Sequence, residues 1–213
     1  MGKEEKVINY YVLCNKLKNI IRTGWKYWNI QKDRLESVAE HIFWVQMLAI
    51  AMKSEYQYDI DIMKVIFMIA IHELGESVIW DLTQFEILKE EKKKMEHEAV
   101  HNILKDLIDG DEIEKIFLEF DAHETKESLF AYHCDKLECD LQCKLYDEET
   151  HVEVDIEKHR SRIHDDVVKK LLGEWKSLWE MWLTFGQRNY NYDENFMAVS
   201  NYALNHKISS LNV

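Results

Sequence analysis

The sequence predicts an all-α protein, and three observations support this. Proline is absent and only 6 glycines occur among 213 residues, so turn signals are sparse and long helices are favoured. Apolar residues make up 46% of the chain, which is enough to form a folded core. Apolar side chains also recur at helical spacing over several long stretches. We therefore expect one domain over residues 1–213, a helical bundle extended by C-terminal helices from about residue 150.

The composition excludes several classes of partner. A net charge of −13 without a basic face argues against a nucleic-acid polymer, although a local cation could still bind a small phosphate ester. No apolar run approaches the length of a membrane span, and the N-terminus has no signal-like apolar segment. The four cysteines form no CxxC pair, which favours reduced thiols. We expect a cytoplasmic protein without membrane contacts.

Residues 4–21 are predicted to form an amphipathic helix, which ends at the RTGWKYW segment, residues 22–28. Trp25 in this segment has two possible roles. It could cover the core, which is the commoner role for a buried aromatic, or it could form the wall of a pocket. In the second case Arg22 would contact an anion.

A capping box at Ser37–Glu40 predicts the start of the next helix. His41 then shares the apolar face of that helix with aliphatic residues, so it is predicted to point inward. A single histidine in such a place is usually a core residue. A second inward-facing histidine, His72, is followed by a carboxylate, and the pair favours metal ligation.

The stretch 62–81 is the most informative part of the chain. It begins as an apolar helix and then places His72, Glu73 and Glu76 on or beside the buried face, with Asp81 at its end. Burying a histidine and carboxylates is costly unless they pair, accept hydrogen bonds or hold a metal. This stretch is therefore predicted to contain the chemistry.

Further helices are predicted over residues 86–109, 112–120 and 126–147, the last with a cap at Thr125. His97 and His101 have the i, i+4 spacing of a metal clamp, but their highly charged surroundings indicate a solvated helix face. Asp135 lies beside the apolar stripe of the third helix. It could approach a shared ion, or it could form a surface ion pair with a nearby lysine.

The last third of the chain is predicted to be helical over residues 149–185, followed by a final helix capped by Asn191 or Asp193. Trp175, Trp179 and Trp182 form an aromatic stripe in the first of these. Such a stripe usually packs within a protein, although it could also contact a second subunit.

The inward-facing groups together resemble a known pattern. His41, the His72-Glu73 doublet and Asp135 lie on separate predicted helices, which is similar to the H…HD…D arrangement of the HD-domain metal-dependent phosphohydrolases. The chain more closely resembles the branch of small 5′-deoxynucleotidases that act on nucleoside monophosphates. The matching segments run from Leu17 to about Tyr146: RTGW, ESVAEH, HELGE followed by WD, ETKESLF and DKLECDLQ.

This resemblance implies an HD-like helical bundle and a role for each matching residue. One divalent metal, from among Mn, Fe, Co, Ni and Zn, would be bound by His41, His72, Glu73 and Asp135. Glu76 would position or deprotonate the attacking water. In the substrate pocket, Arg22 would bind the phosphate, Asp81 would meet the sugar and Trp25 would be a further substrate contact. The resemblance also implies a homodimer.

One position departs from the family pattern. The family doublet is His-Asp, whereas this chain has Glu73, whose side chain is one methylene longer. Ligand distances in metal sites are held to about ±0.2 Å, so a longer side chain must fold back or bind differently. The alternatives are retained activity with an altered metal preference, weak metal binding, and a site that has lost its function.

Two further functions are compatible with the sequence. The same pattern occurs in hydrolases of nucleoside triphosphates and alarmones, which would need extra basic residues that the motifs here lack. Alternatively, the chain could be a catalytically degenerate helical protein that binds a partner through its tryptophan stripe.

Overall fold

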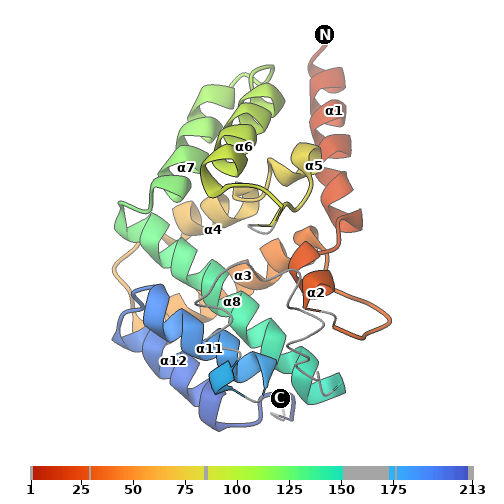
Figure 1. Ribbon diagram of the computed structural model, residues 1–213. Helices are drawn as coiled ribbons and strands as arrows, with labels where there is room; N and C mark the ends of the chain where they lie inside the picture. The colour runs from red at the N-terminus through yellow and green to blue at the C-terminus, as the bar shows by residue number, and fades with distance from the viewer. Residues whose placement is uncertain (1, 29, 84–85, 151–172, 176, 211–213) are drawn as a thin grey trace. The chain divides into compact units, whose positions relative to one another are not determined.

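The computed structural model describes residues 2–28, 30–83, 86–150, 173–175 and 177–210. The fold is all-α as predicted, with the helices labelled in Figure 1. An isolated bridge joins Ile21 and Ser37 in the first part of the chain. None of the helices in these ranges is both long and apolar enough to cross a membrane.

The chain divides into two compact units. The first comprises Met1–Thr23 and Glu36–Tyr132, and the second comprises Gly24–Leu35 and His133–Val213. The single domain expected over residues 1–213 stays a prediction, and the two units are described separately below.

The first unit begins with α1 (Lys3–Asn15), which is shorter than the helix predicted over residues 4–21. The chain tightens into the 3₁₀ helix η1 (Lys16–Asn19) and then leaves helical geometry at Ile20. This change places Leu17 and Ile20 in a small buried cluster with Val38. Tertiary burial of these two side chains thus replaces the last turn of the predicted helix.

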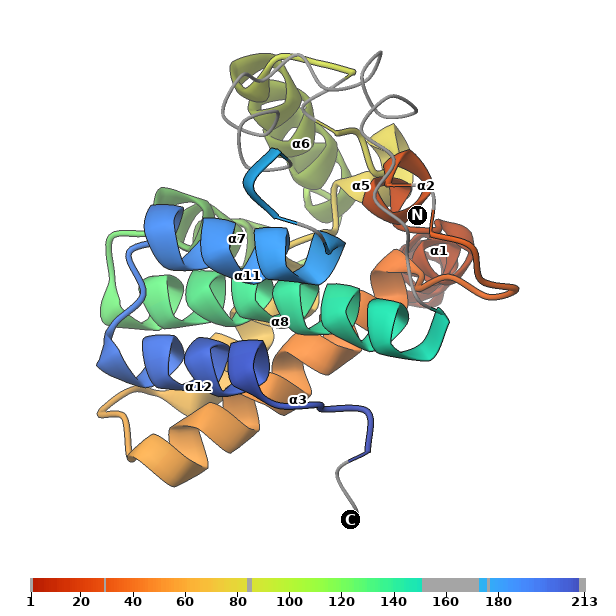
Figure 2. The same cartoon turned by 60° about the horizontal axis from the view of Figure 1, so that its bottom comes forward.

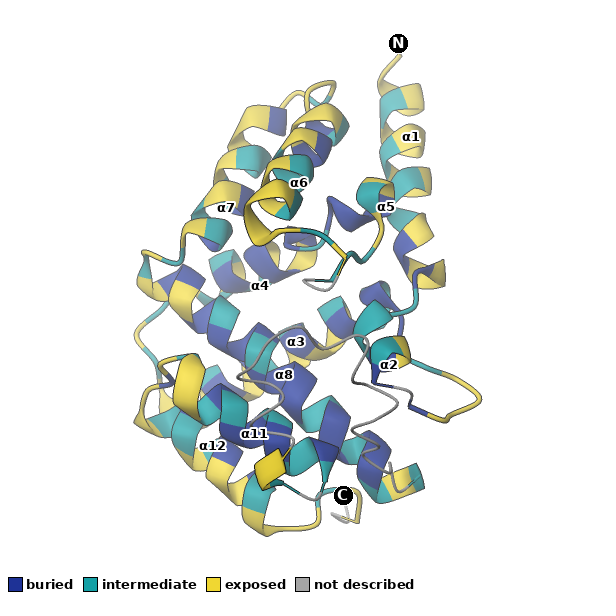
Figure 3. Cartoon of the chain, in the orientation of Figure 1, coloured by how far each residue is buried: buried dark blue, intermediate teal, exposed yellow. Residues whose placement is uncertain are grey.

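The predicted capping box is confirmed at the start of α3 (Val38–Tyr56). The Glu40 carboxylate accepts from the Ser37 backbone N–H at 2.9 Å, and the Ser37 hydroxyl accepts from the Glu40 N–H at 3.3 Å. Helix α3 buries one stripe along its length, as Figure 3 shows, and this stripe consists of Val38, His41, Val45, Ala49 and Met52. His41 therefore points inward, as its place in the apolar pattern predicts.

Helix α4 (Ile62–Ile71) ends before the predicted catalytic residues rather than continuing through them. Residues 72–75 form a turn held by short-range bonds, including Leu74 N–H to Ile71 O at 3.0 Å. The short helix α5 (Glu76–Ile79) follows. A Cβ added at Gly75 would lie 3.3 Å from the Glu96 backbone, so the turn passes very close to the next helix.

Helices α6 (Lys89–Leu104) and α7 (Gly110–Ala122) pair along their length and pack against Ile71 and Leu74. His97 contacts the Asp121 carboxylate at 2.7 Å, and His101 contacts Glu114 at 3.0 Å. Within the described residues, neither histidine belongs to a cluster of metal-ligand spacing. The two histidines thus make hydrogen bonds to carboxylates on a helix face, as their charged surroundings indicated.

Helix α8 (Lys126–Thr150) begins in the first unit and continues into the second. Its predicted cap is present, since the Ser128 N–H donates to the Thr125 hydroxyl at 3.2 Å. In the second unit, α11 (Leu178–Asn189) and α12 (Glu194–Asn205) flank α8 (Figure 2). Asp193 caps α12. The helix predicted over residues 149–185 falls mostly on residues 151–172, which lie outside the described residues.

The core of the second unit is aromatic. The Trp25 ring lies 5.3 Å from Tyr146, edge to face, and 5.2 Å from Trp182, stacked. Trp175 and Trp179 pack against the same cluster. Trp25 is only 1% exposed, so its core role is realised in the structure. The tryptophan stripe packs against the same core and is partly buried.

Trp80 occupies an unusual backbone conformation directly before Asp81, with φ 68° and ψ 169°. A side chain in this region costs of order 1–3 kcal/mol, and only glycine adopts it easily. The Trp80 side chain is 65% exposed, so its removal loses little packing. We expect Trp80→Gly to raise the free energy of unfolding by about 1 kcal/mol, measured by thermal denaturation.

The matched control is Trp80→Ala, which removes the indole but keeps the Cβ that causes the strain. It should not be stabilised. An equal gain in both variants would show that the indole, rather than the backbone conformation, lowers stability.

Candidate functional site

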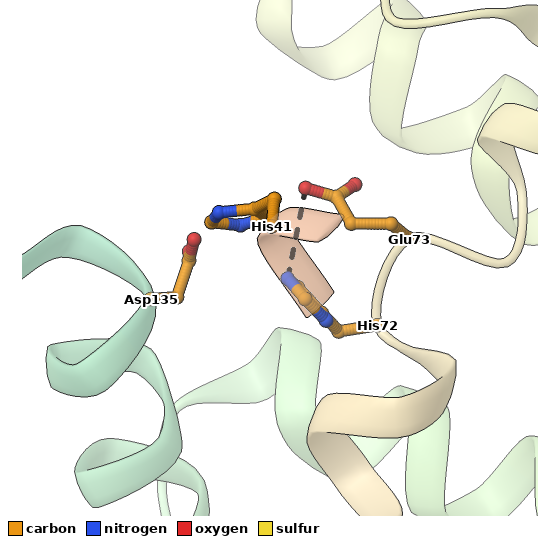
Figure 4. A group of neighbouring side chains, drawn as sticks. All are labelled: His41, His72, Glu73 and Asp135. Atoms are coloured by element: carbon orange, nitrogen blue, oxygen red, sulfur yellow. Dashed lines mark ion pairs between the residues drawn. The ribbon is translucent and has the colours of Figure 1, made fainter. Parts of the chain in front are cut away.

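The first unit brings three predicted metal ligands together. His41 comes from the buried stripe of α3, while His72 and Glu73 come from the turn that follows α4. One ligand atom from each of the three lies within 4.8 Å of the others. The two imidazole rings are 5.5 Å apart between centroids, and Figure 4 shows the His72 ring directed at the Glu73 carboxylate.

The backbone of α4 fixes the orientation and tautomer of His72. Its Nδ1 lies 2.6 Å from the carbonyl oxygen of Ile69, and because a carbonyl can only accept, Nδ1 must donate. In the neutral ring Nε2 therefore has the available lone pair. Nε2 lies 3.6 Å from Glu73 Oε1. The bond from Nδ1 to the Ile69 carbonyl is the arrangement that orients a histidine for metal ligation through its other ring nitrogen.

Glu73 is held as an anion. Arg22 donates from Nη1 to Glu73 Oε1 at 3.2 Å, and both side chains are mostly buried. Burial alone would raise the pKa of Glu73. The charges of His72, Arg22 and Lys92 outweigh that effect and lower the pKa to about 2. The longer side chain of Glu73 thus reaches Arg22, the residue predicted to bind the phosphate.

Glu76 is the most deeply buried carboxylate of the site, with 1% of the residue exposed. Its Oε1 lies 3.2 Å from Lys92 Nζ, while its Oε2 has no hydrogen-bond partner in the part of the chain that the structure describes. Burial, together with the Glu73 and Asp81 carboxylates, raises the pKa of Glu76, and Lys92 opposes the rise. Such a carboxyl group is suited to holding or accepting a proton.

Asp81 lies beside the segment that contains Arg22. Its carboxylate accepts from the backbone N–H of Thr23 at 2.6 Å. The Arg22 N–H in turn donates to the Glu36 carbonyl at 2.9 Å. These two bonds hold the backbone of the segment that carries Arg22. Arg22 and Asp81, both predicted substrate contacts, are thus connected through this segment.

The remaining predicted site residues belong to the second unit. Asp135, which Figure 4 also draws, lies on α8, is 5% exposed and forms an ion pair with Lys136 at 2.8 Å. This is the ion pair that the sequence allowed as an alternative to metal ligation. Trp25 is a core residue of the same unit. Their roles as metal ligand and substrate contact stay predictions.

Sequence reasoning missed Lys92. It lies in the run EEKKK, where every lysine fits a solvated helix face equally well. The structure shows that this side chain turns toward Glu76, while Lys94 is exposed. The i, i+4 spacing of Lys92 and Glu96 was visible in the sequence, but it did not indicate a contact with the site.

Comparison with known proteins identifies the family. The model of the HD domain matches residues 14–179, most of the chain. The chain belongs to the HD-domain family. It is 33% identical to the 5′-deoxynucleotidase HDDC2 of Dictyostelium discoideum over 68% of this chain and 79% of the relative. It is 30% identical to the 5′-deoxynucleotidase hdd1 of Schizosaccharomyces pombe, over 73% and 79% of the two chains.

Solved structures share the fold of this HD-domain protein. A Pyrococcus horikoshii protein superposes with a TM-score of 0.65 at 20% identity, covering 93% of this chain and 98% of its own. A Magnetospirillum magnetotacticum protein described as a predicted metal-dependent phosphohydrolase gives 0.60 at 20% identity, with 95% and 96% covered. The family and the two relatives together make this chain an HD-type hydrolase, as the sequence predicted.

Proposed function

We propose that this HD-domain protein releases phosphate from deoxynucleoside 5′-monophosphates. The observation that best supports this is the group formed by the buried His41 and His72 with the partly buried Glu73, beside the deeply buried Glu76. The two relatives named 5′-deoxynucleotidases, at 33% and 30% identity, support the choice of substrate.

The donor set fits a divalent transition metal. Two imidazoles and a carboxylate suit Mn, Fe, Co, Ni or Zn. Because Nδ1 of His72 is bonded to the Ile69 carbonyl, Nε2 is the ring nitrogen that can bind the metal. In the proposed site Asp135 is the fourth ligand, and Lys136 would orient its carboxylate. A metal bound there would lower the pKa of a bound water and polarise the phosphoryl oxygen.

The protein groups around the ligands have separate proposed tasks. Glu76 positions the attacking water and accepts its proton, for which its raised pKa is suited. Arg22 binds the phosphate by exchanging part of its contact with Glu73 for the incoming anion. Asp81 is proposed to contact the sugar, and Trp25 stays a proposed further substrate contact.

A nucleoside triphosphate or alarmone is the alternative substrate. Of the described cations, Arg22 and Lys92 contact the carboxylates of Glu73 and Glu76. Because both cations are already paired with carboxylates, they suit a single phosphate better than a chain of phosphates. The charge balance therefore favours a monophosphate.

The proposed activity is tested by phosphate release from purified protein loaded in turn with Mn, Fe, Co, Ni and Zn. We expect turnover of deoxynucleoside 5′-monophosphates, weaker turnover of triphosphates, and loss of activity with a chelator. Preferred release from triphosphates would favour the alternative. Inactivity with every nucleotide and metal would reject the enzymatic function and favour the alternative, a helical protein that binds a partner.

We also propose a homodimer in the cytoplasm. The tryptophan stripe packs against the aromatic core of the second unit, which leaves it only partly exposed as the interface suggested by the sequence. Helix α3 instead exposes a large apolar face, formed by Phe43, Trp44, Met47 and Ile50. Sedimentation at several concentrations tests the assembly, and a monomer at tens of micromolar would reject it.

A further inference from the structure

We propose that Lys92 is a positioning residue for the hydrolytic reaction and holds the Glu76 carboxylate in its working orientation. Lys92 Nζ contacts only one of the two Glu76 oxygens in the described structure, Oε1 at 3.2 Å. The other oxygen, Oε2, is buried without a hydrogen-bond partner among the described residues. One oxygen is therefore anchored, and the second is available to bind a water. The proposal rests on the role proposed above for Glu76.

The fold brings Lys92 to this position through a close approach of α6. Gly75, directly before Glu76, has no side chain, so the Glu96 backbone can approach it closely. A Cβ at Gly75 would lie only 3.3 Å from the Glu96 backbone. Lys92 is one turn before Glu96 on the same helix and also contacts its carboxylate at 3.3 Å. Glu76 and Lys92 thus lie on two segments whose backbones pack closely at Gly75 and Glu96.

The charges around Lys92 agree with this role. Ligand atoms of Glu73, Glu76 and Glu96 lie within 4.8 Å of one another, a concentration of negative charge that needs a cation. Burial lowers the pKa of Lys92, but the neighbouring carboxylates of Glu76, Glu73, Glu96 and Asp81 together raise it above its usual value, so the ammonium group keeps its charge. Lys92 therefore keeps a positive charge beside Oε1 of Glu76, and Oε2 is left to bind the water.

The kinetic test compares Lys92→Met with Lys92→Arg, using the exposed Lys94→Met as control. We expect Lys92→Met to lower kcat by about 10²-fold with little change in KM, since misplacing a reacting group by 1 Å costs that much. Lys92→Arg should restore part of the rate, and Lys94→Met should match the wild type. A wild-type kcat in Lys92→Met would overturn the proposal.

A double variant separates positioning from direct substrate binding. If Lys92 acts through Glu76, then Lys92→Met/Glu76→Gln should be no slower than Glu76→Gln alone. If the two losses multiply, Lys92 acts independently of Glu76 and the proposal is wrong.

Thermal unfolding of the metal-free proteins provides a readout that does not need activity. Lys92→Met should lower the Tm, because it leaves Glu76 buried without its cation, and adding Glu76→Gln should recover part of the loss. Losses that simply add would show that the Lys92 contact does not hold Glu76. If the wild type is inactive but the double variant still recovers Tm, the proposed function is rejected, while the Lys92–Glu76 contact stands.

Discussion

Replacing Glu76 by glutamine is expected to reduce kcat for phosphate release by about 10²–10⁴-fold, the usual loss when a positioned acid–base group is removed. Glutamine keeps the size of the side chain, and its amide can still contact Lys92, but it cannot accept the proton of the attacking water. Glu76 is not among the predicted metal ligands, so metal content should remain at the wild-type level. Steady-state kinetics and elemental analysis of the same preparations check both expectations.

The control is Glu91→Gln, a neutralised carboxylate on the exposed part of α6. It should turn over like the wild type. Unchanged turnover in Glu76→Gln would remove Glu76 from the mechanism, and a metal-free Glu76→Gln protein would show that the residue supports the ligands instead.

Shortening Glu73 to aspartate is expected to weaken metal binding, even though it restores the His-Asp doublet of the family. Glu73 Oε1 lies 3.2 Å from Arg22 and 3.6 Å from His72 Nε2, so the longer side chain already reaches its partners in this backbone. Removing one methylene withdraws the carboxylate from both. We expect at least about a tenfold loss of affinity, the scale seen when the support of a metal site is altered.

Titration of wild type and Glu73→Asp with Mn, Co, Ni and Zn measures this change. Glu73→Gln, which keeps the length and removes the charge, separates the effect of reach from that of charge. If Glu73 instead marks a site that is losing its function, the aspartate variant gains affinity and turnover. The two interpretations thus predict opposite signs.

The sequence predicted the fold class and the inward-facing groups because both depend on local periodicity. His41 follows a capping box and shares an apolar face, and the structure buries it on α3 as expected. His72 and Glu73 follow a strongly apolar segment, and they do lie together with His41. Where apolar spacing and capping agreed, the prediction succeeded.

The remaining features depend on contacts between segments distant in sequence. The break of α4 before His72 accompanies the packing of Gly75 against Glu96, which no local pattern encodes. The Arg22–Glu73 and Lys92–Glu76 contacts join residues on different elements in the same way. The aromatic core that encloses Trp25 needs α11 to fold back on α8, so its composition could not be read from the spacing of the tryptophans.

Metal content after purification tests the central claim most directly. Elemental analysis of wild type should find about one transition-metal ion per chain, as expected for a site of two histidines and two carboxylates. His72→Ala should lose most of this metal, whereas His97→Ala, whose histidine pairs with Asp121, should retain it. Equal and negligible metal in all three proteins, before and after incubation with each metal, would contradict a metal-dependent site at His41, His72 and Glu73.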